Sequence, residues 1–186
     1  MVVLLVLLGL LFLLIVWAIG IYNKLVRTRN DMQNAWSQID VQLKRRYDLI
    51  PNLVETVKGY AQHERGTLEA VVKARQQAIS VSADDLARKA QAENALSQTL
   101  RSLFAVAEAY PDLKANQNFL ALQEELASTE NKIGFARQYF NDAVMRLNNL
   151  VQMFPSNVFA QVFNFRTGTF FEVEEAAQRD APKVAF

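Results

Sequence analysis

Cysteine is absent from this chain, and His63 is the only histidine. Without cysteine the protein has no disulfide, no thiol nucleophile and no site for lipid attachment at cysteine. A single histidine excludes a metal centre built from several His and Cys side chains. A single histidine still allows a Ser-His-Asp arrangement, but the sequence has no G-x-S-x-G nucleophile elbow. His63 beside Glu64 is typical of a solvated or paired side chain on a helix face. We therefore predict no catalytic, cofactor-binding or metal-binding residues and no enzymatic activity.

Glycine, proline and clustered charge are also scarce. The chain has 6 glycines and 4 prolines, which leaves few positions where a helix would break. Its net charge is +1, with acidic and basic residues interspersed, so it lacks the basic face that nucleic-acid binding needs. Gly59 and Gly66 lie on one predicted helix face, where they favour close approach of another helix over a phosphate-cradling loop. We expect a helical protein that does not bind nucleic acid.

What the sequence does have is a long apolar run. Val2 to Ile21 consists almost wholly of Leu, Val, Ile and Phe, and the first charged side chain is Lys24. About 20 such residues form a helix about 30 Å long, which matches the hydrocarbon core of a bilayer. The alternative is a cleaved signal peptide with a small-x-small site at Ala18-Ile19-Gly20, but no basic residue precedes the run, and the run is too long. We predict a transmembrane anchor over residues 1–23.

The residues beside the run predict its orientation. Lys24, Arg27 and Arg29 follow the run directly, and basic residues next to a span tend to stay in the cytoplasm. Trp17 and Tyr22 suit the aromatic belt at the same interface. We expect a single-pass protein of the cell (inner) membrane, with its N-terminus outside and its main domain in the cytoplasm. The span has no G-x-x-x-G pattern, so a homo-oligomer would form mainly through the soluble part.

Two long stripes with alternating steps of three and four predict long helices and exclude strands. The later stripe comprises Phe119, Leu122, Leu126, Thr129, Ile133, Ala136, Phe140, Ala143, Leu147, Leu150 and Phe154. The earlier stripe comprises Trp36, Ile39, Leu43, Arg46, Ile50, Leu53, Val57, Tyr60, Glu64, Thr67, Val71, Ala74 and Ala78. Stripes as long and regular as these pack against other long helices.

Proline and turn residues predict where these helices end. The earlier stripe keeps its phase through Pro51, and no glycine is available there for a reversal, so a kinked continuous helix is favoured over a hairpin. Residues 80–85 form a predicted turn, with capping-box spacing between Ser82 and Asp85. A third helix follows and ends near Pro111. Its buried side is predicted to hold Leu86, Ala90, Leu96, Leu100, Leu103, Phe104 and Ala107.

These elements predict an all-α fold in which a single transmembrane helix precedes an up-and-down antiparallel bundle of three to four long helices. The predicted domains are the anchor (1–23), the helical bundle (24–154) and a Phe-rich tail with a polar, mobile C-terminus (155–186). Six of the 12 phenylalanines lie between residues 154 and 171. Arg166-Thr167-Gly168 is predicted to turn a small β-hairpin, with Gly168 supplying a positive φ. The tail either plugs the end of the bundle or offers a surface to a neighbouring subunit, another partner or lipid headgroups.

Polar residues also fall in or beside the stripes. Arg46 and Glu64 occupy core positions, whereas Glu130, Arg137 and Asn141 flank the later stripe. A buried charge is costly unless it is paired. We predict that Arg46 pairs with Glu130 across two helices and fixes their register. The alternative is that Arg46 reaches solvent along its aliphatic stem.

Taken together, the motifs resemble the LemA family of bacterial membrane proteins. The matching pieces are Tyr22-Asn23, Arg29-Asn30, Ala35-Trp36, Arg46-Tyr47-Asp48-Leu49-Ile50-Pro51-Asn52-Leu53-Val54, Tyr60-Ala61, His63-Glu64, Tyr110-Pro111-Asp112-Leu113-Lys114-Ala115, Glu130-Asn131-Lys132-Ile133, Ala136-Arg137-Gln138-Tyr139-Phe140-Asn141, Phe154-Pro155-Ser156-Asn157 and Phe170-Phe171-Glu172. They are collinear over roughly residues 17–172. Two departures occur: Leu147 stands where the family often has Tyr, and Asn164 replaces a Gly common between the tail phenylalanines.

The resemblance implies a single-span protein with a cytoplasmic helical bundle and no established enzymatic activity, and it transfers no catalytic residues. It also implies a role in membrane organisation, since relatives take part in magnetosome formation and some accompany a membrane metalloprotease. We therefore expect a non-enzymatic scaffold that contacts the lipid bilayer, self-assembles as a homo-oligomer through its bundle, and helps to organise or remodel the membrane. The alternatives are an adaptor or regulator of another membrane protein, such as a metalloprotease, and an enzyme using His63 or a carboxylate pair.

Overall fold

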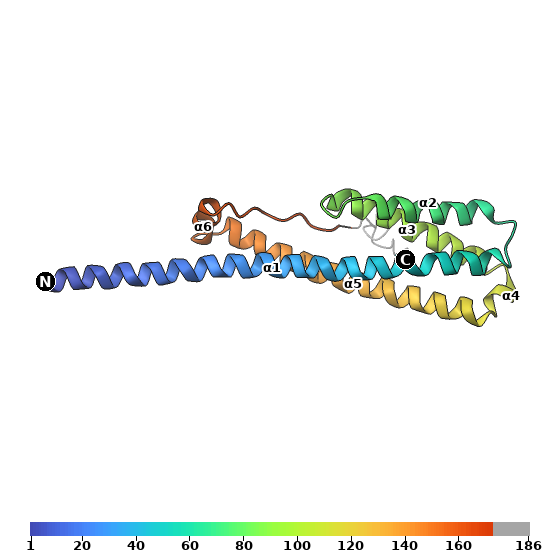
Figure 1. Ribbon diagram of the computed structural model, residues 1–186, viewed down its shortest axis with the longest axis horizontal. Coiled ribbons are helices and arrows are strands. Elements are labelled where there is room, and N and C mark those ends of the chain that lie inside the picture. Colours follow the sequence, from blue (N-terminus) through green and yellow to red (C-terminus); the bar gives the residue numbers. More distant parts are fainter. Residues whose placement is uncertain (173–186) are drawn as a thin grey trace, which may run out of the picture. The chain divides into compact units, whose positions relative to one another are not determined.

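A computed structural model of the protein describes residues 1–172, and within that range the regular elements are all helices. They are α1 (Val2–Lys58), α2 (Arg65–Ser80), α3 (Leu86–Ala107), α4 (Pro111–Lys114), α5 (Gln117–Gln152) and α6 (Ser156–Val162), as Figure 1 shows. The all-α fold with a long apolar N-terminal helix is confirmed. The predicted polar, mobile C-terminus, from residue 173 onward, lies outside the described residues.

Two compact units make up the chain. Unit 1 comprises Met1–Asp40 and Gly134–Phe170, and the described part of unit 2 comprises Val41–Ile133 together with Phe171 and Glu172. Helices α1 and α5 each contribute a stretch to both units. The two units are defined by packing, whereas the predicted anchor, bundle and tail are defined by membrane contact and function. The predicted domain boundaries therefore stay a prediction.

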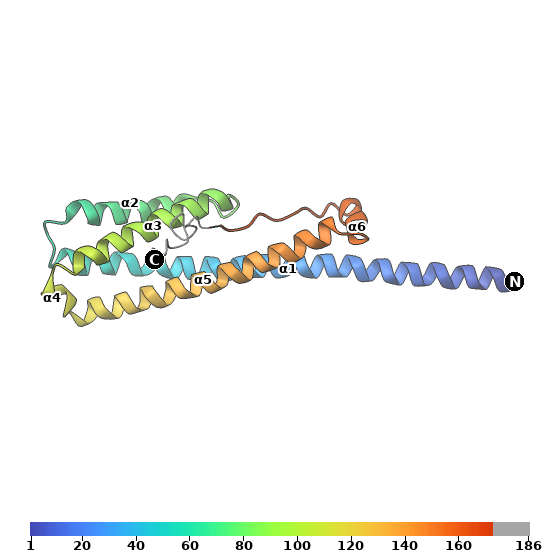
Figure 2. The same ribbon diagram turned by 180° about the vertical axis from the view of Figure 1, so that it is seen from behind.

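Unit 2 is an antiparallel bundle of the end of α1, helices α2 and α3, and the start of α5 (Figures 1 and 2). Helix α1 runs through Pro51 to Lys58, so the predicted continuous helix is confirmed. Pro51 cannot donate to the Tyr47 carbonyl four residues earlier, but Arg75 Nε on α2 donates to that carbonyl at 2.7 Å and replaces the missing hydrogen bond. Pro51 itself is exposed, whereas Ile50 and Leu53 beside it are fully buried. The earlier stripe is buried at Leu43, Arg46, Ile50, Leu53, Val57, Val71, Ala74 and Ala78.

The chain reverses after α1, in a loop over residues 59–64 that the sequence pattern did not predict. The interpretation of Gly59 and Gly66 as one helix face is therefore wrong, because Gly59 lies at the start of this loop and Gly66 lies in α2 after it. His63 is exposed in the loop, so its placement on a helix face is wrong as well. The phase of the stripe continues across the loop because both flanking helices bury one face in the same core.

Helix α3 starts where the turn residues predict, but with a different cap. The Asp85 side chain accepts a hydrogen bond from the backbone N–H of Arg88 at 3.1 Å, so Asp85 caps the helix. Ser82 instead accepts from the backbone N–H of Asp84 at 3.3 Å, so the predicted capping box is absent here. Leu86 and Phe104 are only half-buried, whereas two charged residues, Lys89 and Glu93, are buried.

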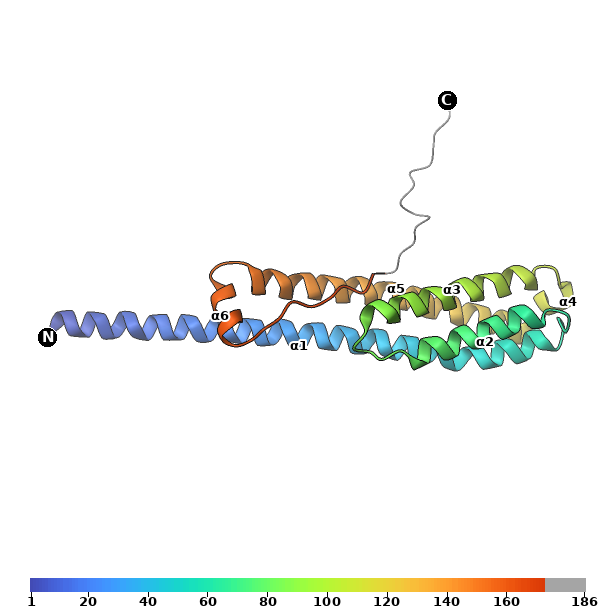
Figure 3. The ribbon, with the colours of Figure 1, turned by 90° about the horizontal axis from the view of Figure 1, so that it is seen from above.

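Unit 1 contains the start of α1, the end of α5, and α6, which lies beside α1 (Figure 3). The rings of Trp36 on α1 and Phe140 on α5 are 5.5 Å apart. Leu25, Ala160 and Phe165 form a small buried core, packed against Ile21, Val26, Leu150, Val151 and Phe159. The later stripe is buried or half-buried throughout α5, but Phe154 lies beyond the helix end and is 82% exposed.

The predicted β-hairpin at residues 166–168 is wrong, since the described residues after α6 contain no strand. The positive φ, 55°, belongs to Asn164 and not to Gly168. Gly168 is needed for close approach, because a Cβ there would lie 2.8 Å from the Met32 sulfur. Its backbone is also clamped: its N–H donates to Asn148 Oδ1 at 2.8 Å, and Asn148 Nδ2 donates to its carbonyl at 3.1 Å.

Candidate functional site

The most distinctive polar feature of unit 2 is an arginine buried in the bundle core. Arg46 on α1 is only 2% exposed. Its Nη1 donates to Glu130 Oε2 on α5 at 2.7 Å, which confirms the predicted pair. The same nitrogen donates to Ser97 Oγ on α3 at 3.1 Å, and Ser97 Oγ donates to Glu130 Oε1 at 3.2 Å. Arg46 thereby joins three helices, and the alternative in which it extends to solvent is wrong.

A second carboxylate, which the sequence pattern missed, lies deeper. Glu93 on α3 is 4% exposed, accepts a hydrogen bond from Arg46 Nη2, and accepts another from the Tyr47 hydroxyl. Lys89 Nζ lies 3.6 Å from Glu93 Oε1 and donates to the Ala78 carbonyl at 2.8 Å. The Lys89 ammonium also lies 5.3 Å from the centre of the Tyr47 ring. This core cluster, formed by Arg46, Tyr47, Lys89, Glu93, Ser97 and Glu130, therefore ties α3 to α1, α2 and α5.

The charges of the core cluster balance. Arg46 and Lys89 carry positive charge, and Glu93 and Glu130 carry negative charge, so no net charge is left to attract a substrate. The pairs of the core cluster join side chains on different helices, and a buried ion pair adds little to stability compared with an apolar core of similar volume. The cluster is suited to a structural role.

A second polar contact joins the α1–α2 loop to the end of α3. The Tyr110 hydroxyl donates to Glu64 Oε1 at 3.1 Å, which gives the core-phase Glu64 its partner. Desolvation of the phenol, together with the Glu64 carboxylate, raises the pKa of Tyr110 above its ordinary value. Close by, Asn116 Nδ2 donates to the Tyr60 hydroxyl at 2.9 Å. These contacts hold the loop against the neighbouring turn. The other flanking residues, Arg137 and Asn141, are half-buried on α5 in unit 1.

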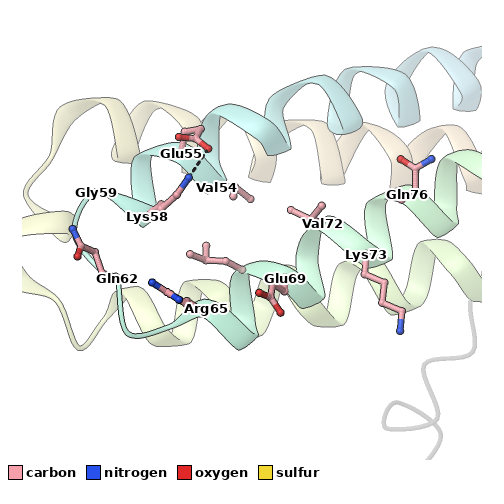
Figure 4. A pocket seen from close by; sticks show the side chains of 11 residues that line it. Val54, Glu55, Lys58, Gly59, Gln62, Arg65, Glu69, Val72, Lys73 and Gln76 are labelled. Carbon is pink, nitrogen blue, oxygen red and sulfur yellow. Dashed lines mark hydrogen bonds and ion pairs between the residues drawn. The ribbon is translucent and has the colours of Figure 1, made fainter.

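A groove of about 1090 Å³ lies between the end of α1 and α2 in unit 2. Val54 and Val72 point toward one another across it (Figure 4). Leu68 is the third apolar side chain of its lining. Glu55, Lys58, Arg65, Glu69 and Lys73 supply charged side chains at its edges. An apolar floor with a mixed-charge rim suits an amphipathic helix better than a small polar substrate.

No arrangement for metal chemistry occurs within residues 1–172, where no group of three or more His, Cys, Asp or Glu residues converges. In the same range, one helix is long and apolar enough to cross a membrane: α1, whose apolar window has a mean hydropathy of 3.3 and is not buried inside the protein. The Trp17 ring, upstream of the candidate cleavage site, packs 5.9 Å from the Phe159 ring in unit 1. The end of the apolar segment therefore contacts α6, while the rest of the segment is exposed.

An exposed apolar helix of membrane-spanning length, followed by an antiparallel bundle of helices, is typical of a membrane-associated helical protein. A sequence profile of the LemA family matches residues 35–186, and the chain belongs to that family. The predicted family is confirmed. The LemA family is not known as an enzymatic one.

Individual relatives point to the same class. Protein LemA of Metamycoplasma hominis is 25% identical over 162 residues, which cover 87% of this chain and 74% of that protein. Magnetosome protein MamQ of Magnetospirillum gryphiswaldense and Magnetosome protein MamQ 1 of Paramagnetospirillum magneticum are each 22% identical over 179 residues. These matches cover 83% of this chain and 66% of either MamQ protein, so the chain spans slightly less than two thirds of the magnetosome relatives.

Proposed function

We propose that this protein is a non-enzymatic scaffold of the cell (inner) membrane, anchored by the start of α1, that self-assembles through its helical bundle and helps to organise the bilayer. The core cluster supports a structural role because Arg46, Lys89 and Glu93 are buried and each of its charged groups has a partner of opposite charge. The magnetosome relatives support a role at membranes by their names alone.

The main support for self-assembly is a pair of exposed aromatic side chains on α5. Phe135 is 74% exposed and Tyr139, one helical turn further on, is 47% exposed. The Arg146 guanidinium lies 5.8 Å from the centre of the Tyr139 ring and extends the same face. Aromatic side chains and arginine are the residues most enriched at the energetic centres of protein interfaces. We infer that this aromatic face, comprising Phe135, Tyr139 and Arg146, contacts a second copy of the chain.

The membrane restricts how copies meet. Identical subunits anchored in one bilayer are related by a rotation axis along the membrane normal, so contacting patches lie at similar heights. A specific contact between them has to bury about 1,000 Å² or more. The rings of Phe135 and Tyr139 supply only the centre of an interface of this size, so neighbouring side chains have to contribute the rest of the buried area.

Mass measurement of the full-length protein in mild detergent tests the proposal. We expect the wild type to be oligomeric at micromolar concentration, and Phe135→Ser/Tyr139→Ser to shift it toward monomer. Gln33→Ser/Gln38→Ser, at exposed polar positions of α1 in the same unit, is the matched control and should leave the mass unchanged. A strictly monomeric wild type would defeat the proposal.

The predicted orientation belongs to this proposal, with the N-terminus outside and the bundle in the cytoplasm. It rests on Lys24, Arg27 and Arg29 following the span. Protease added to right-side-out vesicles should leave the bundle intact. Digestion of the bundle from outside would overturn the orientation.

The groove between α1 and α2 favours a second candidate, an adaptor that holds or regulates another membrane protein such as a metalloprotease. Its apolar floor of Val54, Leu68 and Val72 matches the apolar face of a partner helix. An adaptor should copurify with one dominant partner and stay small alone. Val72→Glu should release that partner, because Val72 is half-exposed and a carboxylate there would meet the apolar face. If the Val72→Glu variant still copurified with the partner, the groove would not be the binding site for that partner.

A further inference from the structure

The segment around α6 has no charge and turns its larger apolar side chains outward. No charged residue occurs from Leu147 to Phe165. Helix α6 buries the small residues Ser156 and Ala160, while Phe154 before it is 82% exposed and Val162 at its end is 72% exposed. A surface helix of a water-soluble protein shows the opposite pattern, with apolar residues inside and polar residues outside. Residues 153–163, here termed the α6 segment, therefore present a largely apolar surface to their surroundings.

Contacts within unit 1 fix where the α6 segment lies along α1. Phe159 packs edge-on against Trp17, with ring centres 5.9 Å apart. Phe163 packs against Tyr22, with ring centres 4.8 Å apart. Ala160 is buried in the same small core as Leu25. The segment is thus attached to the last turns of the apolar run and to the turn that follows it.

These attachment points correspond to a narrow range of depth in a bilayer. Trp17 lies inside the apolar run and Lys24 is the first charged residue after it. At 1.5 Å per residue the helix covers about 10 Å between them. That distance is comparable with the headgroup layer that flanks the hydrocarbon core, where Trp and Tyr rings gather. A segment packed on Trp17 and Tyr22 lies at this layer.

Basic side chains mark the water side of the same region. The Arg29 guanidinium lies 5.1 Å from the centre of the Phe165 ring, and Arg166 follows that ring in the sequence and is exposed. Lys24 and Arg27 on α1 are also exposed. Lipid phosphates lie just outside the acyl boundary, so these cations are placed to meet them while the uncharged segment lies deeper.

We propose that the α6 segment is a second membrane contact, which inserts Phe154, Val158, Val162 and Phe163 into the headgroup–acyl boundary beside the end of the span. The partner is the lipid surface of the leaflet in which the span ends. The apolar surface of the segment is continuous with the lipid-facing surface of α1, because Trp17 and Tyr22 belong to both. The inference stands apart from self-assembly, since it concerns the contact of each single copy with lipid.

The cysteine-free chain allows a direct test by spin labelling. A nitroxide is attached to the cysteine of the full-length Phe154→Cys or Val162→Cys variant. Each labelled variant is then reconstituted into vesicles of phosphatidylcholine and phosphatidylglycerol at a high lipid-to-protein ratio. Leu10→Cys is the reference inside the span, and Gln138→Cys is the matched exposed position of unit 1 on α5. Collision rates with oxygen, which concentrates in lipid, and with a water-soluble nickel chelate report the depth of each label. Circular dichroism of each labelled variant checks that helix content is retained.

We expect the labels at 154 and 162 to collide readily with oxygen and several-fold less with the nickel chelate than the label at 138, at a depth shallower than the label at 10. Collision with the chelate as frequent as at 138 would place the segment in water and overturn the proposal. Protection from both reagents would also overturn it, by placing the segment against another protein copy. Self-assembly in detergent is measured separately, so either idea can fail while the other holds.

Discussion

Substitution of Arg46 offers a quantitative test of how the bundle is specified, because its two carboxylate partners differ in exposure. The Arg46 and Glu93 side chains are 2% and 5% exposed, whereas Glu130 is 50% exposed. Removing one member of a buried pair leaves the other charge without compensation, which costs about 3–5 kcal/mol. An exposed pair contributes only about 0.2–1 kcal/mol.

Two double-mutant cycles that share the Arg46→Met variant separate these contributions. In the first cycle Glu93→Gln is the partner, and in the second Glu130→Gln. We expect the Arg46–Glu93 coupling to be about 2 kcal/mol or more and the Arg46–Glu130 coupling to be below about 1 kcal/mol. Arg46→Met alone should lower the midpoint of thermal unfolding by roughly 6–20 °C, given about 2–4 °C per kcal/mol for a chain of this size.

The assay is thermal and denaturant unfolding of the full-length protein in detergent, followed by circular dichroism. The double variant Arg46→Met/Glu93→Gln should regain only part of the stability lost by Arg46→Met, because the unpaired buried carboxylate is removed but the buried Lys89 loses its anionic partner. Lys89 keeps its hydrogen bond to the Ala78 carbonyl in every variant. A coupling for Glu130 equal to or larger than that for Glu93 would refute the argument from burial.

Three further predictions concern single positions. Asp85→Ala removes the N-cap of α3 and should lower the free energy of unfolding by about 1 kcal/mol, measured against Asp84→Ala, whose side chain caps nothing in the described residues. Gly168→Ala places a Cβ against the Met32 sulfur and should destabilise unit 1 by about 1 kcal/mol, with rescue by Met32→Ala; equal stability of Gly168→Ala and wild type would contradict the close approach. Tyr110 has a raised pKa, so the folded protein holds the phenol proton more tightly than the unfolded chain, and this part of the stability is present below pH 10 and lost as the pH rises through the folded pKa. Tyr110→Phe does not titrate and should lose less stability above pH 10 than the wild type, and parallel curves would disprove this.

Periodicity in the sequence predicted much of the bundle. The steps of three and four identified the buried faces of α1 and α5, and the cost of a buried charge correctly predicted the Arg46–Glu130 pair. Continuity through Pro51 was predictable for the same reason, because the apolar phase does not shift at the proline. Helix periodicity is a local property, and these features depend on it directly.

The deeper half of the core cluster was not predictable in this way. Lys89 and Glu93 lie four residues apart on α3, a spacing that on an isolated helix is typical of an exposed ion pair. Only the position of Arg46 and Tyr47 on another helix makes them a buried group. The loop after Lys58 was missed because two helices that share one core can carry a stripe in one phase. The tail was misjudged because Asn164, and not Gly168, adopts the positive φ.

An image of the intact, detergent-extracted particle by electron cryomicroscopy tests the scaffold proposal most directly. The proposal predicts a closed assembly of identical copies in which Phe135 and Tyr139 are covered by a neighbouring copy. Single copies, with both rings facing solvent, would contradict it.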